Sequence, residues 1–440
     1  IRVAGGNPSD RQLAGFRFVV PSLEGPGTLE ILAEDWNGVR GTVHRREIDP
    51  IRLLAPECDT RERFSTFRFV NALPHRPCAR TLDRETSSLR IEWILPDFTR
   101  GAGGHAAIFR IVDALERAGH RCRLWIIDKS LHGSPTRVRE VIGESFLPLR
   151  AEVRFLEPAD IGCVAGDVGF ATDRWTAYYL RAAGNLAHRF YLIQDYEPYF
   201  YPLGAAYFLA EQTYRFGFTP IVSSEWLAAK IRPFAGCEVA RFGYAVDHRI
   251  YKPASTPRED GAGKPRIVFY ARAATSRRAV EIGVLALERL AARRSDFAVD
   301  FFGEDLGDLA MDFEFESHGI LSASELAALY RRGTAGIVFS ATNHAILVKE
   351  MMACGLPVIE LDRPNVSEVY PHGVLRRTDP EPAAVADAIE SLLDDPAGRK
   401  RMREEGLRYV SGFSWERETA RVVEAVDRAL GRGPMPGGEP

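Results

Sequence analysis

One strand–helix–strand segment combines a helix start with a carboxylate: TAGIVFSATNHAILVKEMMACGLPVIEL. Asn343 is a good N-cap for the run HAILVKEMMAC, and Gly355 can close that helix. The N–H groups at a helix start carry partial positive charge, so Asn343, His344 and Ala345 could bind a phosphate. Glu350 follows two helical turns after Asn343, on the same face, and could accept hydrogen bonds from ribose. The pattern therefore suits a nucleotide, although a capped helix packed on a sheet would look the same.

The longer run ALYRRGTAGIVFSATNHAILVKEMMACGLPVI resembles the donor-nucleotide segment of the GT-B glycosyltransferases of retaining family four. Residues 350–358 match the second half of their motif, Glu-Ala-Met-Ala-Cys-Gly-x-Pro-Val. The first half departs, because Thr342 stands where the family has a glutamate, eight residues before Glu350. The resemblance implies that Thr342, like the helix start, contacts the donor.

Three arginines follow the strand-like run RIVFYA. The family has an arginine at this strand end and a lysine five residues later, and Arg272 and Arg277 occupy those two places. Arg278 takes the place of the next residue, a glycine in the family. Guanidinium groups bind phosphate through paired hydrogen bonds and keep their charge. We expect Arg272 and Arg277 to act in catalysis and Arg278 to bind the donor, with solvated surface arginines as the alternative.

The run RFYLI predicts a strand that delivers Gln194, Asp195 and Glu197 to its carboxyl end, where open α/β sheets bind ligands. The family often has His-Asp here, and Gln194 replaces the histidine. We predict a catalytic role for Asp195 and donor binding for Gln194. Asp195 and Glu197 could also hold a divalent metal. Alternate residues on an extended segment point apart, however, and the resemblance implies that no metal is required.

Two further segments are expected near the donor. The strand LRIEWILPDF leads through a glycine-rich loop into a helix, and this loop resembles the glycine loop of the family's acceptor domain. Gly103, Gly104 and His105 are therefore donor-binding candidates, although His105 could equally be a surface residue that caps the helix. The turn SHGIL resembles the turn whose backbone reads the nucleobase, which makes His318 and Ile320 candidates as well.

Composition limits the alternatives. With 57 basic and 60 acidic residues among 440, the chain gives no reason to expect nucleic acid as a partner. It has no apolar run of membrane-spanning length, and its six scattered cysteines suit reduced thiols. It begins with Ile1, so it could be a piece of a longer protein.

The pattern predicts a β-rich extension (1–50), a connector (51–88), an acceptor domain (89–255), a donor domain (256–430) and a disordered tail (431–440).

QDYEP, YARAATSRR and FSATN…EMMACGLPV together are most similar to WsaF-type rhamnosyltransferases, which use dTDP-L-rhamnose to build cell-surface glycans. The resemblance implies an α/β, GT-B fold with two Rossmann-like domains facing across a cleft. It also implies a retaining transfer of L-rhamnose onto a growing polysaccharide, without a metal or other cofactor. The acceptor would be a glycan, with a lipid-linked one left open. The expected location is the cytoplasm, with peripheral contact at the inner membrane face also left open.

Two other functions fit the same sequence. A nucleotide-sugar epimerase can share this architecture and would interconvert free nucleotide sugars without an acceptor. A non-catalytic glycan-binding module of a larger enzyme would explain the missing first glutamate. Product analysis with and without a glycan acceptor separates the three.

Overall fold

The computed structural model describes residues 27–34, 40–48, 67–83, 86–127, 131–255, 263–307 and 309–432. The chain divides into two units, residues 1–72 and 73–440, and each is considered by itself. In the first unit, β1 (Gly27–Glu34) pairs antiparallel with β2 (Arg40–Ile48), and a short helix α3 (Phe69–Ala72) follows. The two strands lie within the predicted β-rich extension (1–50), whose other residues lie outside the described part of the chain.

The second unit contains two parallel sheets, and the first has the strand order β5-β4-β3-β6-β7-β8-β9. Its strands are β3 (Arg90–Leu95), β4 (Arg121–Ile126), β5 (Glu152–Phe155), β6 (Val168–Ala171), β7 (His188–Ile193), β8 (Thr219–Val222) and β9 (Ala240–Arg241). The order reverses direction between β3 and β6, which is the Rossmann-like arrangement.

The second sheet repeats this topology with the order β12-β11-β10-β13-β14-β15, again all parallel. Its strands are β10 (Arg266–Tyr270), β11 (Ala298–Phe302), β12 (Glu314–Ser317), β13 (Ala335–Ile337), β14 (Val358–Leu361) and β15 (Arg376–Thr378). Here the order reverses between β10 and β13. The predicted α/β class with two Rossmann-like domains is therefore confirmed.

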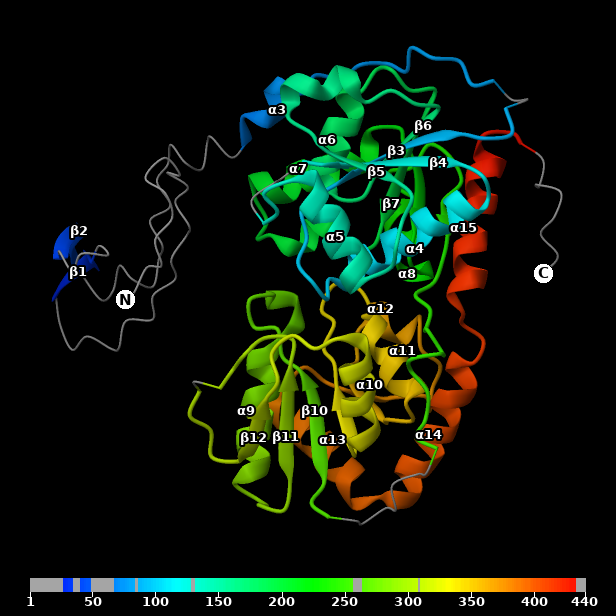
Figure 1. The fold of residues 1–440 in the computed structure, drawn as a ribbon. Helices are drawn as coiled ribbons and strands as arrows, with labels where there is room; N and C mark the ends of the chain where they lie inside the picture. Colours follow the sequence, from blue (N-terminus) through cyan, green and yellow to red (C-terminus); the bar gives the residue numbers. More distant parts are fainter. Residues whose placement is uncertain are drawn as a thin grey trace. The chain divides into compact units, whose positions relative to one another are not determined.

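Helices cover both sheets (Figure 1). Those of the first domain are α4 (Gly103–Arg117), α5 (Pro135–Ser145), α6 (Arg174–Ala182), α7 (Ala205–Gln212) and α8 (Glu225–Ile231). Those that follow in the chain are α9 (Val280–Ala291), α10 (Ala323–Arg332), α11 (Ile346–Ala353), α12 (Pro364–Ser367), α13 (Pro382–Asp394), α14 (Pro396–Val410) and α15 (Trp415–Ala429). None of the described helices is long and apolar enough to cross a membrane.

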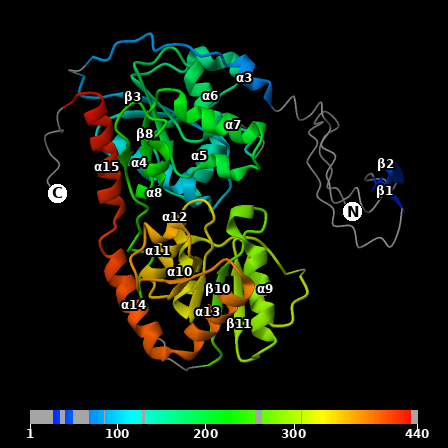
Figure 2. The ribbon, with the colours of Figure 1, turned by 180° about the vertical axis from the view of Figure 1, so that it is seen from behind.

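The last helix returns to the first domain. Trp415, Val422 and Val426 of α15 are buried in the core of the first sheet, next to α4. Figures 1 and 2 show α14 and α15, in orange to red, following one another along the side of both domains. Just after α15, Arg432 forms an ion pair with Asp427, with 3.3 Å between Nε and Oδ1. Residues 433–440 of the expected tail lie outside the described part of the chain.

Candidate functional site

Two loops leave neighbouring carboxyl ends of the second sheet at the point where its strand order reverses. The arginine loop (271–279) follows β10, and the bridging loop (338–345) follows β13. Arg278 Nη1 donates to the carbonyl oxygen of Phe339 (3.3 Å) and to Ser340 Oγ (3.2 Å). The backbone N–H of Ala341 donates to the carbonyl oxygen of Arg277 (3.0 Å). The loops are thus joined at the place where open α/β sheets bind their ligands.

The bridging loop also reaches the first domain. Thr342 Oγ1 donates to Asp195 Oδ2 (2.9 Å), across 147 positions of sequence. Asn343 Nδ2 donates to the carbonyl oxygen of Gln194 (2.7 Å) and to Ser223 Oγ (3.0 Å). Thr342 and Asn343 are both buried. The structure therefore brings together four of the residues singled out in the sequence: Gln194, Asp195, Thr342 and Asn343.

Arg277 and Asp195 face each other across the two domains without a full set of hydrogen bonds. Arg277 Nε lies 3.7 Å from Asp195 Oδ2, and the guanidinium lies over the Phe200 ring, 4.4 Å from its centroid. Arg277 Nε and Asp195 Oδ1 are buried and have no hydrogen-bond partner among the described residues. Such unpaired buried groups are uncommon in proteins and are a reason to look for a ligand.

Burial controls the electrostatics of this pair. It raises the pKa of Asp195, while Arg277 and the Thr342 hydroxyl oppose that rise. It lowers the pKa of Arg277, which the charge of Asp195 partly restores. Arginine remains charged in proteins, so the guanidinium is the fixed cation of the pair. Arg278 and Arg272, both half-buried on the same loop, add two positive charges that further lower the pKa of Arg277.

The end of the arginine loop has an unusual backbone. Ala279 has φ of 43° and is the one non-glycine residue with positive φ among those described. An L-residue in this conformation costs about 1–2 kcal/mol. The residue links the short 3₁₀ turn that carries Arg277 and Arg278 (Ser276–Arg278) to α9. Strain of this kind is often found where a loop is held in a functional conformation.

The start of α11 corrects one prediction. Asn343 does not cap the helix: α11 begins at Ile346, its N-cap is Ala345, and no side chain caps it. Asn343 is instead held by the first domain, so it and Glu350 do not share a helical face. The His344 ring is buried between Tyr244 and Tyr370, at centroid distances of 5.0 and 5.9 Å. Free N–H groups for a phosphate would thus come from the turn that begins at Ile346, three residues later than predicted.

Glu350 lies in a different environment from the arginine loop. Burial raises its pKa to about 7, an effect that Arg110 and a hydrogen bond with Tyr251 oppose. Arg110 pairs with Asp247 (Nη2 to Oδ2, 3.2 Å) and lies over the Trp415 ring, 5.2 Å from its centroid. The groups that act on Glu350 are therefore Arg110 of α4 and Tyr251 of the crossover, the segment that follows β9 (242–255).

The glycine loop lies against the second domain. A Cβ on Gly103 would approach Ile346 Cγ2 to 3.3 Å, and one on Gly101 would approach Ile320 Cγ2 to 3.4 Å. Gln194 Nε2 donates to the carbonyl oxygen of Gly104 (3.1 Å). The 3.3 Å contact would be tight, so Gly103 permits the close approach of the two domains, whereas Gly101 is favoured by its φ of 75°.

The two candidate histidines outside the bridging loop are engaged in their own domains. The His105 ring stacks on Phe98, and burial lowers its pKa to about 4. His318 Nε2 lies 2.7 Å from Asp300 Oδ1, in a cluster that includes Glu316. These three side chains could hold a metal by their spacing. Asp300 already makes two 2.6 Å bonds with Arg266, however, which indicates an ion-pair cluster. Ile320, two residues after His318, is exposed.

Several residues near the bridging loop were not identified from sequence. Ser223 and Ser224 bond to Asn343, the Tyr244 hydroxyl donates to the carbonyl oxygen of Gln194 (3.3 Å), and Glu360 holds Ser340. The serines could have been found, because they directly follow β8, the neighbour of β7. Nothing in the pattern of the apolar run LPVIEL indicated a role for Glu360.

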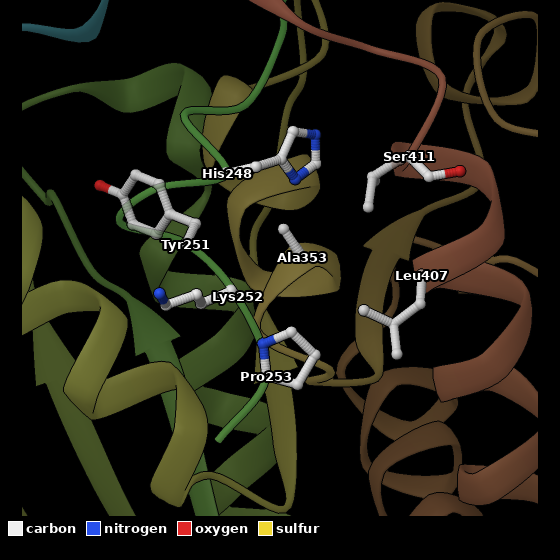
Figure 3. Close-up of a pocket in the computed structure, with 8 residues that line it drawn as sticks. His248, Tyr251, Lys252, Pro253, Ala353, Leu407 and Ser411 are labelled. Atoms are coloured by element: carbon white, nitrogen blue, oxygen red, sulfur yellow. The ribbon is translucent and has the colours of Figure 1, made fainter. Parts of the chain in front are cut away.

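A cavity of about 250 Å³ lies elsewhere, beside the crossover. Figure 3 shows residues that line it: His248, Tyr251, Lys252 and Pro253 of the crossover, Ala353 of α11, and Leu407 and Ser411. None of the predicted site residues lines it. It is therefore separate from the candidate site.

The sequence and the fold of this chain are similar to those of known proteins. Residues 265–390 match the family model described as "WsaF, C-terminal domain". The chain therefore carries a WsaF C-terminal domain, and its two Rossmann-like sheets form a GT-B fold. It is 30% identical over 348 residues to the O-antigen biosynthesis protein RfbC of Myxococcus xanthus, an alignment covering 76% of this chain and 26% of that protein.

Two further similarities support the GT-B assignment. The D-inositol 3-phosphate glycosyltransferase of Arthrobacter sp. (strain FB24) is 28% identical over 235 residues, covering 48% of this chain and 55% of that protein. The fold is similar to Anabaena Alr3699/HepE in complex with UDP-glucose, with a TM-score of 0.62 and 14% identity. That match covers 77% of this chain and all of the solved chain. The chain thus spans about a quarter of the length of the first sequence relative and about half of the length of the second. It spans the whole length of the solved chain.

Proposed function

We propose that this GT-B protein transfers a sugar from a nucleotide-sugar donor to a glycan acceptor during polysaccharide synthesis. The observation that carries the proposal is the Arg277–Asp195 pair, which lies where three loops from two domains meet. Arg277 Nε and Asp195 Oδ1 are buried there without a hydrogen-bond partner among the described residues. The WsaF C-terminal domain and the resemblance to an O-antigen biosynthesis protein support the polysaccharide assignment.

Arg272, Arg277 and Arg278 would bind the donor diphosphate together with the free N–H groups at the start of α11. Negative charge grows on the diphosphate as the sugar–phosphate bond breaks, so fixed cations lower the barrier. The acceptor oxygen forms the new bond to the sugar on the same face, and the departing phosphate oxygen takes the acceptor proton. Configuration is retained in this reaction without a protein nucleophile. Asp195 would position Arg277 and Thr342 for this reaction.

The donor we propose is dTDP-L-rhamnose. Gln194 and Thr342 stand where hexose-binding members of the family have a histidine and a glutamate, and both are neutral. L-Rhamnose carries a methyl group at carbon six and differently directed hydroxyls. Neutral side chains that both donate and accept hydrogen bonds suit such a sugar. The thymine base rests on the resemblance to WsaF-type enzymes alone.

We expect dTDP-L-rhamnose to be consumed only when a glycan acceptor is present, with release of dTDP. A buried polar group left unpaired by the wrong sugar costs about 1–3 kcal/mol. The transfer rate should therefore be at least about tenfold lower with UDP-glucose, UDP-N-acetylglucosamine or GDP-mannose. Product analysis with each donor, with and without lipid-linked glycan, measures this. Faster transfer from another donor would overturn the rhamnose assignment. Conversion of the free donor without acceptor would favour an epimerase, and binding without turnover a glycan-binding module.

We also expect activity to persist in excess EDTA. Arginine side chains and a helix start would do the work that a divalent ion performs in metal-dependent transferases. The measurement is the initial rate before and after chelation, followed by addition of magnesium or manganese. Loss of activity that either ion restores would make Asp195 and Glu197 a metal site and contradict the proposed mechanism.

A further inference from the structure

Glu360 is a buried carboxyl group that the proposed mechanism does not yet use. It lies one residue before the end of β14, next to β13 and the bridging loop, and its exposed fraction is 0%. It is the one charged residue in the run LPVIEL, and the other five residues of that run are apolar. A charged group in such a place normally needs a counter-charge or several hydrogen bonds.

Glu360 accepts a hydrogen bond from Ser340, a buried residue of the bridging loop. The backbone N–H of Ser340 donates to Glu360 Oε1 (2.9 Å), and Asn365 Nδ2 donates to the Ser340 carbonyl oxygen (2.7 Å). Arg278 Nη1 donates to Ser340 Oγ (3.2 Å). Ser340 is therefore fixed at its N–H, carbonyl and hydroxyl groups, two residues before Thr342 reaches Asp195.

The second oxygen of this carboxyl is not used. Glu360 Oε1 accepts from both Ser340 and Leu361, whereas Oε2 is buried and has no hydrogen-bond partner in the described part of the chain. Burial raises the pKa of Glu360 to about 8, against the opposing effect of these bonds and of Arg278. The raised pKa favours the protonated carboxyl at neutral pH, so Glu360 adds little counter-charge to Arg278, whose charge also acts on Asp195.

We propose that Glu360 is a positioning residue for the anionic donor: it fixes the bridging loop and takes up a proton when a nucleoside diphosphate binds. This inference rests on the proposed function. A negative ligand near Arg278 disfavours a second negative charge on Glu360, so the protonated form binds it better. Protonation also prevents the carboxylate from competing with the diphosphate for the arginine.

The charged and titratable groups around Glu360 are few. Arg278 comes from the arginine loop, and Tyr370, whose pKa lies well above its ordinary value because of burial, follows α12. On the adjacent strand β15, Arg377 is the register partner of Glu360, but its guanidinium contacts His372 and Asp362. Among the described residues, Arg278 is therefore the cation that would link Glu360 to a bound phosphate.

The test is calorimetric titration of the full chain with dTDP and with UDP at pH 8, in two buffers of different ionisation enthalpy. At a pH equal to its pKa the carboxyl is half protonated, so wild type should take up as much as about half a proton at this group. Glu360→Gln keeps both acceptor bonds and cannot titrate. We expect it to lose that uptake while its affinity at pH 7 stays within about twofold. Wild-type affinity should fall about three- to tenfold from pH 7 to pH 9, and less in the variant.

Glu92→Gln is the matched control, since Glu92 is a buried carboxyl on β3 whose pKa burial also raises, but which bonds to Trp125 and Arg123. We expect it to keep the wild-type uptake. Equal uptake by wild type and Glu360→Gln would overturn the inference while leaving the proposed function standing. Absence of nucleotide binding by wild type would overturn the proposed function. Should Glu360→Gln not fold, wild-type affinity that is unchanged between pH 7 and pH 9 would still refute the inference.

Discussion

We expect Arg277→Ala to lower turnover by about 10²–10³-fold, as loss of a donor that stabilises charge in the transition state typically does. Arg277 is the cation that faces Asp195 from the other domain, and its Nε has no hydrogen-bond partner among the described residues. The fold should survive, because the side chain lies on a loop and is partly exposed. The measurement is the initial rate of nucleoside diphosphate release with donor and acceptor present.

Arg293→Ala is the control for this variant. Arg293 follows α9 in the same domain and pairs with Asp387 at the surface, with 2.7 Å between Nη1 and Oδ1. We expect its turnover to stay close to that of wild type, since exposed ion pairs contribute little. Near-wild-type turnover in a folded Arg277→Ala protein would remove Arg277 from the mechanism.

The second large effect is expected for Asp195→Asn: turnover about 10²-fold lower or worse, with no loss of thermal stability. Burial raises the pKa of Asp195, so its ionised form opposes folding, and a neutral amide removes that cost. The amide oxygen can still accept from Thr342. Arg277 loses its counter-charge, so donor affinity should not fall. The expected pattern is a lower kcat with an unchanged or lower KM for the donor, checked by steady-state kinetics and a melting curve.

Glu197→Gln serves as the matched control two residues away. Glu197 is also buried, burial raises its pKa to about 8, and it accepts from the backbone N–H of Arg174 (2.6 Å). We expect the amide to preserve that bond and most of the activity. Equal loss in the two variants would instead indicate that the carboxylates act as a pair, contrary to the mechanism proposed.

The sequence was a good guide to the ends of strands. Asp195 and Thr342 follow β7 and β13, and parallel topology alone places such residues on the ligand-binding edge of each sheet. Arg277 and Arg278 follow β10 in the same way. Gly355 was correctly predicted to close α11: its φ is 79°, and the N–H of Leu356 donates back to the carbonyl oxygen of Met351 (3.0 Å).

What failed depended on contacts between distant segments. Asn343 has a strong intrinsic preference for the N-cap, but its bonds to Gln194 and Ser223 hold it outside the helix. The choice between these partners is made by tertiary structure, which local propensity does not describe. Glu360 was missed for the same reason, since its function depends on Ser340 of the neighbouring strand's loop.

The structure of the chain bound to dTDP or UDP tests the central claim most directly. The account predicts that the diphosphate lies against Arg277 and Arg278 at the start of α11, with Asp195 on the opposite side. A nucleotide bound instead in the cavity beside His248 and Tyr251, or at the Asp300–His318 cluster, would contradict it.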